Sequence, residues 1–271
     1  VGPGGAWQEP VGPSACLQGG TFATLADPTL LGGNTIDPTQ PQGVSPASGY
    51  NSGEPVFIRL DDSDQNVDAA VIDTAVVTVT NDVSGDSETI RLTETGINTG
   101  VFVGYVPTAG GAGASGDCVL QGAQDSTVRV SYTDPADSND TAEDSAAIDP
   151  LSLVFESRTG AAIDGARVSL IDAQTGLPAT VLGNDGVSQF PSTITSGGTE
   201  VDSSGTSYVF GTGEFRFPVV PDGNYRLVVV PPATYEAPSR AAEADLQSLP
   251  GAPYVLGPAS FGAAFTKSGG V

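Results

Sequence analysis

The sequence predicts an all-β protein built from two β-sandwiches in tandem, with an extended tail at each end. Short runs of residues alternate between apolar and polar side chains, which is the period of a strand with one buried face. Turn-forming residues are abundant, with 36 glycines and 21 prolines among 271 residues. Leucine, glutamate and lysine, which favour long helices, are sparse, so we expect little helix.

The N-terminal segment, residues 1–45, is rich in Gly, Pro, Thr and Asp and shows no sustained periodicity. We therefore expect an extended tail that forms no core by itself. The alternation begins at Val56, with Ile58 and Leu60 on the same face. This run predicts the first strand of a domain spanning residues 46–149.

Four more strands are predicted in this first domain, each dominated by Val, Ile, Thr, Tyr or Phe and separated from the next by polar turns. They cover residues 75–82, 88–94, 100–107 and 126–134. The polar and acidic stretch 134–150 then predicts the boundary between the two domains.

The second predicted sandwich spans residues 150–235. Its strands are expected at 151–157, 166–173, 213–220 and 225–232, with a long polar excursion that ends near Tyr208. Residues 236–271 predict a C-terminal tail, in which 241–249 forms two helical turns. We expect this tail to contact a neighbouring copy of the chain.

The charge is strongly acidic, with 32 Asp and Glu residues against 9 Lys and Arg residues. This imbalance repels nucleic acid and anionic membrane surfaces and attracts cations. It is concentrated between Asp61 and Asp149, where 17 acidic residues face only Arg91 and Arg129. Because no stretch approaches roughly 18 consecutive apolar residues, we expect no membrane insertion.

Cys16 and Cys118 are the two cysteines of the chain. Their spacing fits neither a CxxC motif nor a set of metal ligands, so the simplest interpretation is a disulfide formed in an oxidising compartment. The alternative is a pair of buried free thiols. A disulfide would tie the predicted N-terminal tail to the first domain.

The strongest local motif lies directly after the first predicted strand, where Asp62, Asp64 and Asn66 occupy alternate positions. Oxygen ligands at this spacing can converge on calcium. An EF-hand is excluded, because Val67 stands where that loop needs glycine and no flanking helices are predicted. A calcium site at the end of a sandwich remains, which later acidic residues would complete: Asp134, Asp137 and Asp140, with Glu94 as a weaker candidate.

The rival interpretation of these acidic residues is a solvated loop that holds no ion. Calcium is favoured because close carboxylates repel and raise one another's pKa unless a cation neutralises them. Zinc is disfavoured because the chain contains no histidine.

The sequence predicts no enzymatic activity and no cofactor other than calcium. Without histidine, the usual serine and cysteine triads cannot form. Residues 111–116 match the pattern GxGxxG, but no predicted helix follows them, so we interpret them as a hairpin loop rather than a dinucleotide site.

The segment from Val56 to Asp149 resembles an immunoglobulin-like repeat of very large bacterial secreted and surface proteins. The resemblance rests on DSDQNVD, GDSETIRLTETGINTGVFVGYVPT and VSYTDPAD. It implies an extracellular immunoglobulin-like sandwich that serves as a stalk or spacer.

The segment from Leu151 to about Pro232 resembles the prealbumin-like sandwich of collagen-adhesin B-type and carboxypeptidase-regulatory-like domains. Six positions carry the pattern: Gly165, Gly176, Gly213, Phe215, Gly223 and Tyr225. Many collagen-adhesin B-type domains contain a Lys–Asn isopeptide bond. The only lysine here is Lys267, in the predicted tail, so no internal isopeptide bond is expected.

These observations predict a structural subunit of a bacterial extracellular filament or surface fibre. Its partners would be other copies of itself, joined by tail and strand contacts and stiffened by calcium and a disulfide. One alternative is a spacer or calcium-dependent ligand-binding segment of a giant adhesin, with a glycan or a surface protein as partner. Another is an accessory module of a hydrolase. The expected location is secreted, at the cell surface.

Overall fold

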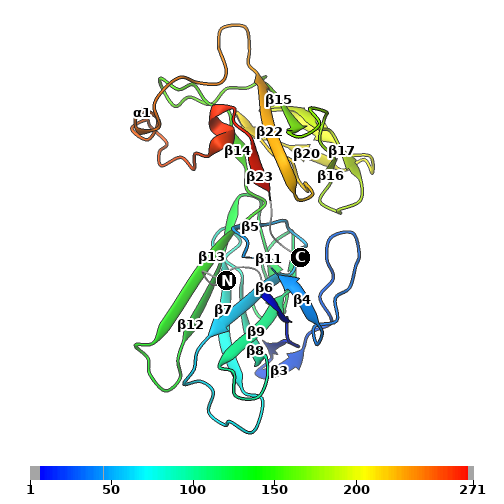
Figure 1. Cartoon of the computed structure of the whole chain (residues 1–271), viewed down its shortest axis with the longest axis vertical. Coiled ribbons are helices and arrows are strands. Elements are labelled where there is room, and N and C mark those ends of the chain that lie inside the picture. Colours follow the sequence, from blue (N-terminus) through cyan, green and yellow to red (C-terminus); the bar gives the residue numbers. More distant parts are fainter. Residues whose placement is uncertain (1–6, 45, 268–271) are drawn as a thin grey trace. The chain divides into compact units, whose positions relative to one another are not determined.

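The computed structural model describes residues 7–44 and 46–267 (Figure 1) and is all-β. Helix in this part of the chain is confined to the single turn α1 (Glu243–Leu246) and the 3-10 turn η1 (Pro258–Phe261). Among the described residues, no helix has the length and apolar character needed to cross a membrane. The chain divides between Pro150 and Leu151 into two compact units, called unit 1 and unit 2 below.

Unit 1 contains one large sheet of nine strands and two small pairs. The path through the large sheet runs β3–β2–β8–β7–β12–β13–β5, and β9 pairs with both β8 and β6. Its strands are β2 (Ala15–Gln18), β3 (Thr21–Thr24), β5 (Gly49–Tyr50), β6 (Val56–Asp61), β7 (Thr74–Asn81), β8 (Ser87–Glu94), β9 (Val101–Val106), β12 (Ser126–Thr133) and β13 (Thr141–Ile148). The small pairs are β1 (Trp7–Pro10) with β4 (Pro41–Val44), and β10 (Thr108–Ala109) with β11 (Leu120–Gln121).

The core of unit 1 is formed by side chains at every second position of these strands. In β8, for example, Ile90 and Leu92 are fully buried, whereas Arg91 between them is partly exposed. They pack against a cluster that includes Val77, Val79, Phe102, Leu120, Val128 and Ile148. The strands predicted from alternation therefore form, because each has one apolar face to bury.

The prediction of an extended N-terminal tail is wrong for the described residues 7–44. This segment contributes four strands, and β2 joins the large sheet beside β8, with Cys16 opposite Ile90. It also covers the outer face of β6 and β9, where Val11 and other apolar residues pack over Phe57. These apolar residues are isolated in the sequence, so they produce no periodic signal although their burial is favourable.

The predicted inter-domain stretch 134–150 contains a strand, β13, which pairs with β12 along all eight of its residues. Only Ala146 and Ile148 of β13 are buried, and its acidic residues remain accessible, with Glu143 forming an ion pair with Arg129. β5 pairs with β13 only at Ala147 and Ile148, and the exposed acidic first half of β13 lacks the apolar alternation that marks a strand in the sequence.

Unit 2 has a four-stranded antiparallel sheet in the order β18–β15–β22–β23. Its strands are β15 (Arg167–Asp172), β18 (Thr193–Thr195), β22 (Gly223–Val230) and β23 (Phe265–Lys267). Three two-stranded pairs accompany it: β14 (Ser152–Leu153) with β21 (Glu214–Phe215), β16 (Val181–Leu182) with β17 (Gln189–Phe190), and β19 (Thr199–Val201) with β20 (Ser207–Val209). Its core includes Val168, Leu170, Phe190, Ile194, Phe210, Phe215 and Tyr225.

The described part of the C-terminal segment packs on unit 2 of its own chain. The predicted two helical turns at 241–249 shorten to α1, which buries Leu246. Further on, the Tyr254 ring stacks on Phe155 with 4.4 Å between ring centroids. The segment ends as β23, which lies at the edge of the sheet beside β22 (Figure 1).

Lys267 therefore lies on a strand of unit 2, not outside the domain as the sequence suggested. Its Nζ is 3.2 Å from Oδ1 of Asp222. The two side chains are 42% and 63% exposed, so their interaction is screened by water. The contact is a surface ion pair.

Candidate metal site

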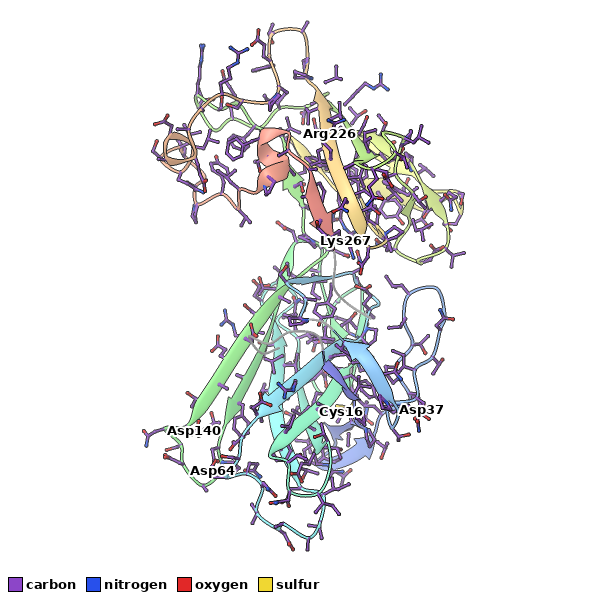
Figure 2. The ribbon with its side chains drawn as sticks, in the orientation of Figure 1. Cys16, Asp37, Asp64, Asp140, Arg226 and Lys267 are labelled. Atoms are coloured by element: carbon purple, nitrogen blue, oxygen red, sulfur yellow. A yellow bond between two sulfur atoms is a disulfide. The ribbon has the colours of Figure 1, made fainter. Side chains whose placement is uncertain are left out.

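The candidate site lies at one end of unit 1, between the loop after β6 and the loop that joins β12 to β13. A pocket of about 180 Å³ opens there. Asp64 and Asp140 lie on these two neighbouring loops (Figure 2). The lining residues are Leu60, Asp61, Asp62, Ser63, Asp64, Tyr132, Asp140 and Ala142.

Three predicted ligands cluster beside this pocket, and two of them, Asp62 and Asp64, line it. Carboxylate oxygens of Asp62, Asp64 and Asp134 all lie within 4.8 Å of one another. Calcium binds oxygen ligands at about 2.3–2.6 Å, so two ligands on opposite sides of the ion are about 4.8 Å apart. The three oxygens therefore fit around a single ion.

Asp62 is buried, and one of its two carboxylate oxygens has no hydrogen-bond donor among the described residues. Its side chain is among the buried charged residues, with 8% exposure. Oδ1 accepts the N–H groups of Asp64 at 3.3 Å and Gln65 at 3.2 Å. Oδ2 is buried and accepts no hydrogen bond from any residue that the structure describes. A buried carboxylate oxygen without a donor is costly, and a bound cation would remove that cost.

Asp134 is fixed by its own loop. Its side chain is 2% exposed, and its Oδ1 accepts the N–H groups of Ala136 and Asp137. The loop closes where the Asp134 N–H donates to the Asp140 carbonyl at 2.9 Å. The backbone thus holds Asp134 in place and brings Asp140 to the wall of the pocket.

The electrostatics of the site reflect crowded negative charge. The Asp62 carboxyl raises the pKa of Asp64. Burial and the Asp62 carboxylate raise the pKa of the Tyr132 hydroxyl. Burial also acts to raise the pKa of Asp62, but its contacts with Asp64, Tyr132 and the N–H groups of the loop outweigh burial and lower it. One carboxylate thus keeps its charge at the expense of its neighbour.

Two predicted ligands are not among the clustered carboxylates. The Asn66 amide donates from Nδ2 to Oδ1 of Asn98 at 2.8 Å and so ties two loops together, while its own Oδ1 is buried and accepts no hydrogen bond from the described residues. Asp137 accepts the N–H of Asn139 at 3.0 Å and belongs to its own turn. Asp140 lines the pocket but is not one of the three clustered carboxylates.

Glu94, the weaker candidate, has a different partner set. Its Oε1 accepts the N–H groups of Thr99 at 2.6 Å and Gly100 at 2.8 Å, and its Oε2 accepts the N–H of Asp73 at 3.1 Å. Burial raises the pKa of Glu94, but these donors outweigh it and hold the pKa below its ordinary value. Glu94 organises the loop of the ETGINTG motif and is not among the three clustered carboxylates.

Gly100, the last residue of that motif, positions the candidate site and was not singled out by the sequence. Its carbonyl accepts the Asp62 N–H at 2.8 Å. Its φ is +64°, and a Cβ there would lie 3.0 Å from the Ser63 Cα. Only glycine fits this close approach. The signal was present in the sequence, since a Gly directly before a predicted strand often marks such a turn.

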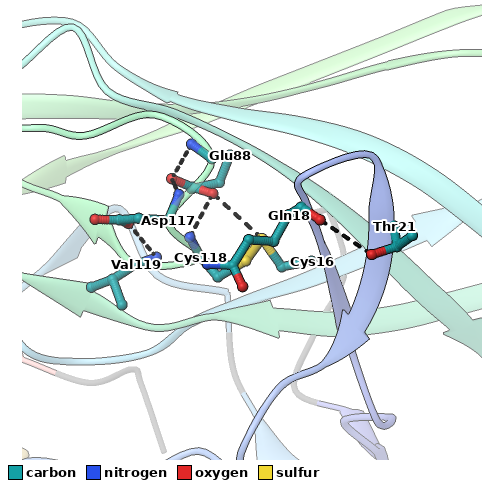
Figure 3. Close-up of a disulfide and its surroundings, with 8 residues drawn as sticks. Cys16, Gln18, Thr21, Glu88, Asp117, Cys118 and Val119 are labelled. Carbon is teal, nitrogen blue, oxygen red and sulfur yellow. Dashed lines mark hydrogen bonds between the residues drawn. A yellow bond between two sulfur atoms is a disulfide. The ribbon is translucent and has the colours of Figure 1, made fainter.

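The predicted disulfide forms between Cys16 and Cys118, with a Cα–Cα distance of 5.6 Å (Figure 3). Beside it lies the fully buried carboxylate of Glu88, whose Oε2 is 3.4 Å from the Cys16 Sγ. Glu88 accepts the N–H groups of Gly116 at 2.9 Å, Asp117 at 3.2 Å and Cys118 at 2.9 Å. The last residue of the loop that matches GxGxxG and the two residues after it therefore donate their backbone N–H groups to the Glu88 carboxylate.

Comparison with protein-family models and with curated proteins finds no match to this chain.

Proposed function

We propose that the chain is a structural subunit of a bacterial extracellular filament or surface fibre, stiffened by one disulfide and by bound calcium. Unit 1 would be an immunoglobulin-like sandwich and unit 2 a prealbumin-like sandwich, in tandem. Neither unit has a catalytic role in this proposal. The observation that carries it is the convergence of Asp62, Asp64 and Asp134 around a buried oxygen that lacks a donor.

Calcium suits the site better than zinc. The ligands are hard oxygens, which calcium prefers, and the chain has no histidine to favour zinc. Calcium takes about six to eight ligands, more than three carboxylates supply. The pocket has room for several water molecules at about 30 Å³ each, which would complete the shell together with Asp140.

An extracellular location is supported by the disulfide, because thiols stay reduced in most cytosols. The charge of unit 1 also fits a calcium-containing environment. Residues 1–150 carry 21 acidic and 3 basic residues, a net charge of −18, whereas residues 151–271 carry 11 and 6, a net charge of −5. Divalent cations would reduce the repulsion within unit 1.

Assembly into a filament would use strand contacts between copies. The sheets of both units have edge strands, and an exposed edge can accept an extended segment from another chain. The other copies of the chain are therefore the proposed partners.

A second candidate function is a calcium-dependent ligand-binding segment of a giant adhesin. It is favoured by four exposed aliphatic residues on the two loops that Asn66 and Asn98 join at this end of unit 1. These are Val67, Val71, Ile72 and Ile97, with 48% to 76% of each side chain exposed. An apolar surface beside a calcium site suits a glycan or a surface protein as ligand.

Thermal melting in calcium and in excess chelator tests the metal part of the proposal. We expect calcium to raise the Tm of the wild-type chain, since an ion that binds only the folded state stabilises it. The Asp62→Asn variant should lose this rise. Asp68→Asn is the matched control, because Asp68 is an exposed aspartate of the same loop that lies outside the pocket lining. A Tm that is equal in calcium and chelator would refute calcium binding.

Light scattering and electron microscopy of concentrated protein in calcium test the assembly part. Filaments or a mass that grows with concentration would support the fibre. A monomer at every concentration, with calcium-dependent hits on a glycan array, would favour the adhesin instead.

A further inference from the structure

The last described strand, β23, is held at the sheet of unit 2 by a short set of contacts. It pairs with β22 through three residues, with Phe265 opposite Tyr225 and Thr266 opposite Asn224. The Thr266 hydroxyl donates to Oδ1 of Asn224 at 2.7 Å. The Phe265 ring packs against the core of unit 2, 6.3 Å from the Tyr225 ring. The seat for β23 is thus an apolar anchor point with a defined register.

The chain before β23 is anchored at Tyr254 and then loosely attached. Tyr254 stacks on Phe155 and exchanges two hydrogen bonds with the Gln247 side chain. The next residue, Val255, is fully exposed, and the only regular element in residues 255–264 is η1. Ten residues span at most about 33 Å when extended. β23 could therefore reach another copy while the chain stays anchored at Tyr254.

The receiving edge is open at one end. β22 pairs with β15 along its whole second half, but on the side of β23 the structure describes strand pairing only as far as Tyr225. Val228 and Val230 lie beyond that point and are 38% and 60% exposed. A strand can leave or enter this edge without the rest of the sheet opening.

We propose that β23 exchanges between copies, so that Phe265–Lys267 of one chain occupies the seat on Gly223–Tyr225 of another. This inference rests on the proposed self-assembly, and it names the partner surface. The exchanged contacts are the same as those within one chain, including the ion pair of Lys267 with Asp222. Exchange therefore sacrifices no specific interaction, which makes it a low-cost route to assembly.

Concentration decides between the two arrangements. A short flexible tether gives its own strand an effective concentration in the millimolar range. Dilute chains would therefore keep β23 in place, and chains packed closely in a fibre would exchange it. Because only three residues pair, each exchanged contact is weak and a fibre would need many of them or further contacts.

Cysteine trapping tests the exchange directly, because both native cysteines are already in a disulfide. Single variants Asn224→Cys and Thr266→Cys are mixed at high protein concentration under mild oxidation. Each chain then has one new cysteine, so a bond between the two positions must join two copies. The control mixture pairs Asn224→Cys with Val255→Cys, whose side chain is exposed on the same segment and faces no partner strand. We expect several-fold more mixed dimer from the first mixture.

Equal yields from the two mixtures would overturn the exchange, provided that the double variant Asn224→Cys/Thr266→Cys forms its disulfide within one chain. If the double variant does not close, concentration-dependent light scattering decides instead. Association that Phe265→Ala weakens several-fold supports the exchange, and association that is absent or unchanged by Phe265→Ala overturns it.

This outcome is separate from the calcium test, because β23 and its seat belong to unit 2 and the candidate metal site belongs to unit 1. If trapping fails but the Tm depends on calcium, strand exchange is refuted, whereas the proposal of a calcium-stiffened extracellular module stands.

Discussion

Glu88 and Asp62 are both buried carboxylates of unit 1, but their surroundings are opposite. Glu88 lies beside the disulfide and accepts three backbone N–H groups, so both of its oxygens have partners. Asp62 lies beside two other carboxylates, and its Oδ2 accepts no hydrogen bond from the described part of the chain. The first site is complete with protein atoms alone, whereas the second has an oxygen that the described residues leave without a donor.

Structural carboxylates and metal ligands differ in their hydrogen-bond donors, even in a protein as acidic as this one. Abundance of Asp and Glu does not distinguish them, and neither does burial. The supply of donors does, because a buried carboxylate needs several hydrogen bonds or a bound cation to keep its charge. By this criterion Glu88 and Glu94 are structural, and the buried Oδ2 of Asp62 is the atom that a cation would satisfy.

The largest expected effect comes from removal of the disulfide beside Glu88. The double variant Cys16→Ser/Cys118→Ser opens a loop between residues 102 apart in sequence. Its free energy of unfolding, measured by urea denaturation, should fall by about 2–5 kcal/mol. The calcium-induced rise in Tm should persist in any fraction that still folds. Loss of that rise would show that the two sites are one cooperative unit.

The next effect distinguishes the two carboxylates by matched amide substitutions. Glu88→Gln places an NH₂ group against backbone donors, so it should cost about 1–3 kcal/mol of unfolding free energy, with or without calcium. Asp62→Asn should cost less than Glu88→Gln in chelator, because it relieves repulsion from Asp64. In calcium the difference in unfolding free energy between the two variants should shrink or change sign, because only Asp62→Asn also loses the stabilisation by the ion. Equal calcium responses of the two variants would contradict the distinction.

The acid dependence of stability sharpens the assignment of Glu94. Its pKa is lowered in the folded chain, so its stabilising effect is present above the ordinary value of 4.5 and is lost as the pH falls through the folded value. Glu94→Gln should therefore lower the Tm at neutral pH and show a smaller further loss in acid than the wild type. Parallel Tm profiles of the two proteins would refute this role.

The smallest effect is expected at Asp137, a predicted ligand that the structure places in its own turn. Asp137→Asn should change the unfolding free energy by no more than about 0.5 kcal/mol. Its calcium affinity, measured by a competitive indicator dye, should match that of the wild type. A clear loss of affinity would return Asp137 to the ligand set.

The sequence alone predicted the positions of the strands that bury one face. The alternation of Val56, Ile58 and Leu60 predicted β6, and similar runs predicted the centres of β7, β8, β9 and β12. Alternation failed where the buried face is small or scattered. In β13 only Ala146 and Ile148 are buried, and in the N-terminal segment Val11 and its neighbours pack across the sheet rather than along a strand.

The site was partly predictable for the same physical reason. Acidic residues after a strand and in a later loop indicated one end of the unit, and the structure brings Asp62, Asp64 and Asp134 together there. The spacing could not show that Asn66 would bond to Asn98, or that Asp137 would cap its own turn. These outcomes depend on the neighbouring loops, which linear spacing does not encode.

Calorimetric titration of calcium into the chelator-treated chain measures directly whether Asp62 belongs to a calcium site, with Asp62→Asn and Glu88→Gln titrated alongside. We expect saturable binding to the wild type and to Glu88→Gln, and its loss in Asp62→Asn. Absence of binding to the wild type, or equal binding to all three proteins, would contradict a calcium site at Asp62.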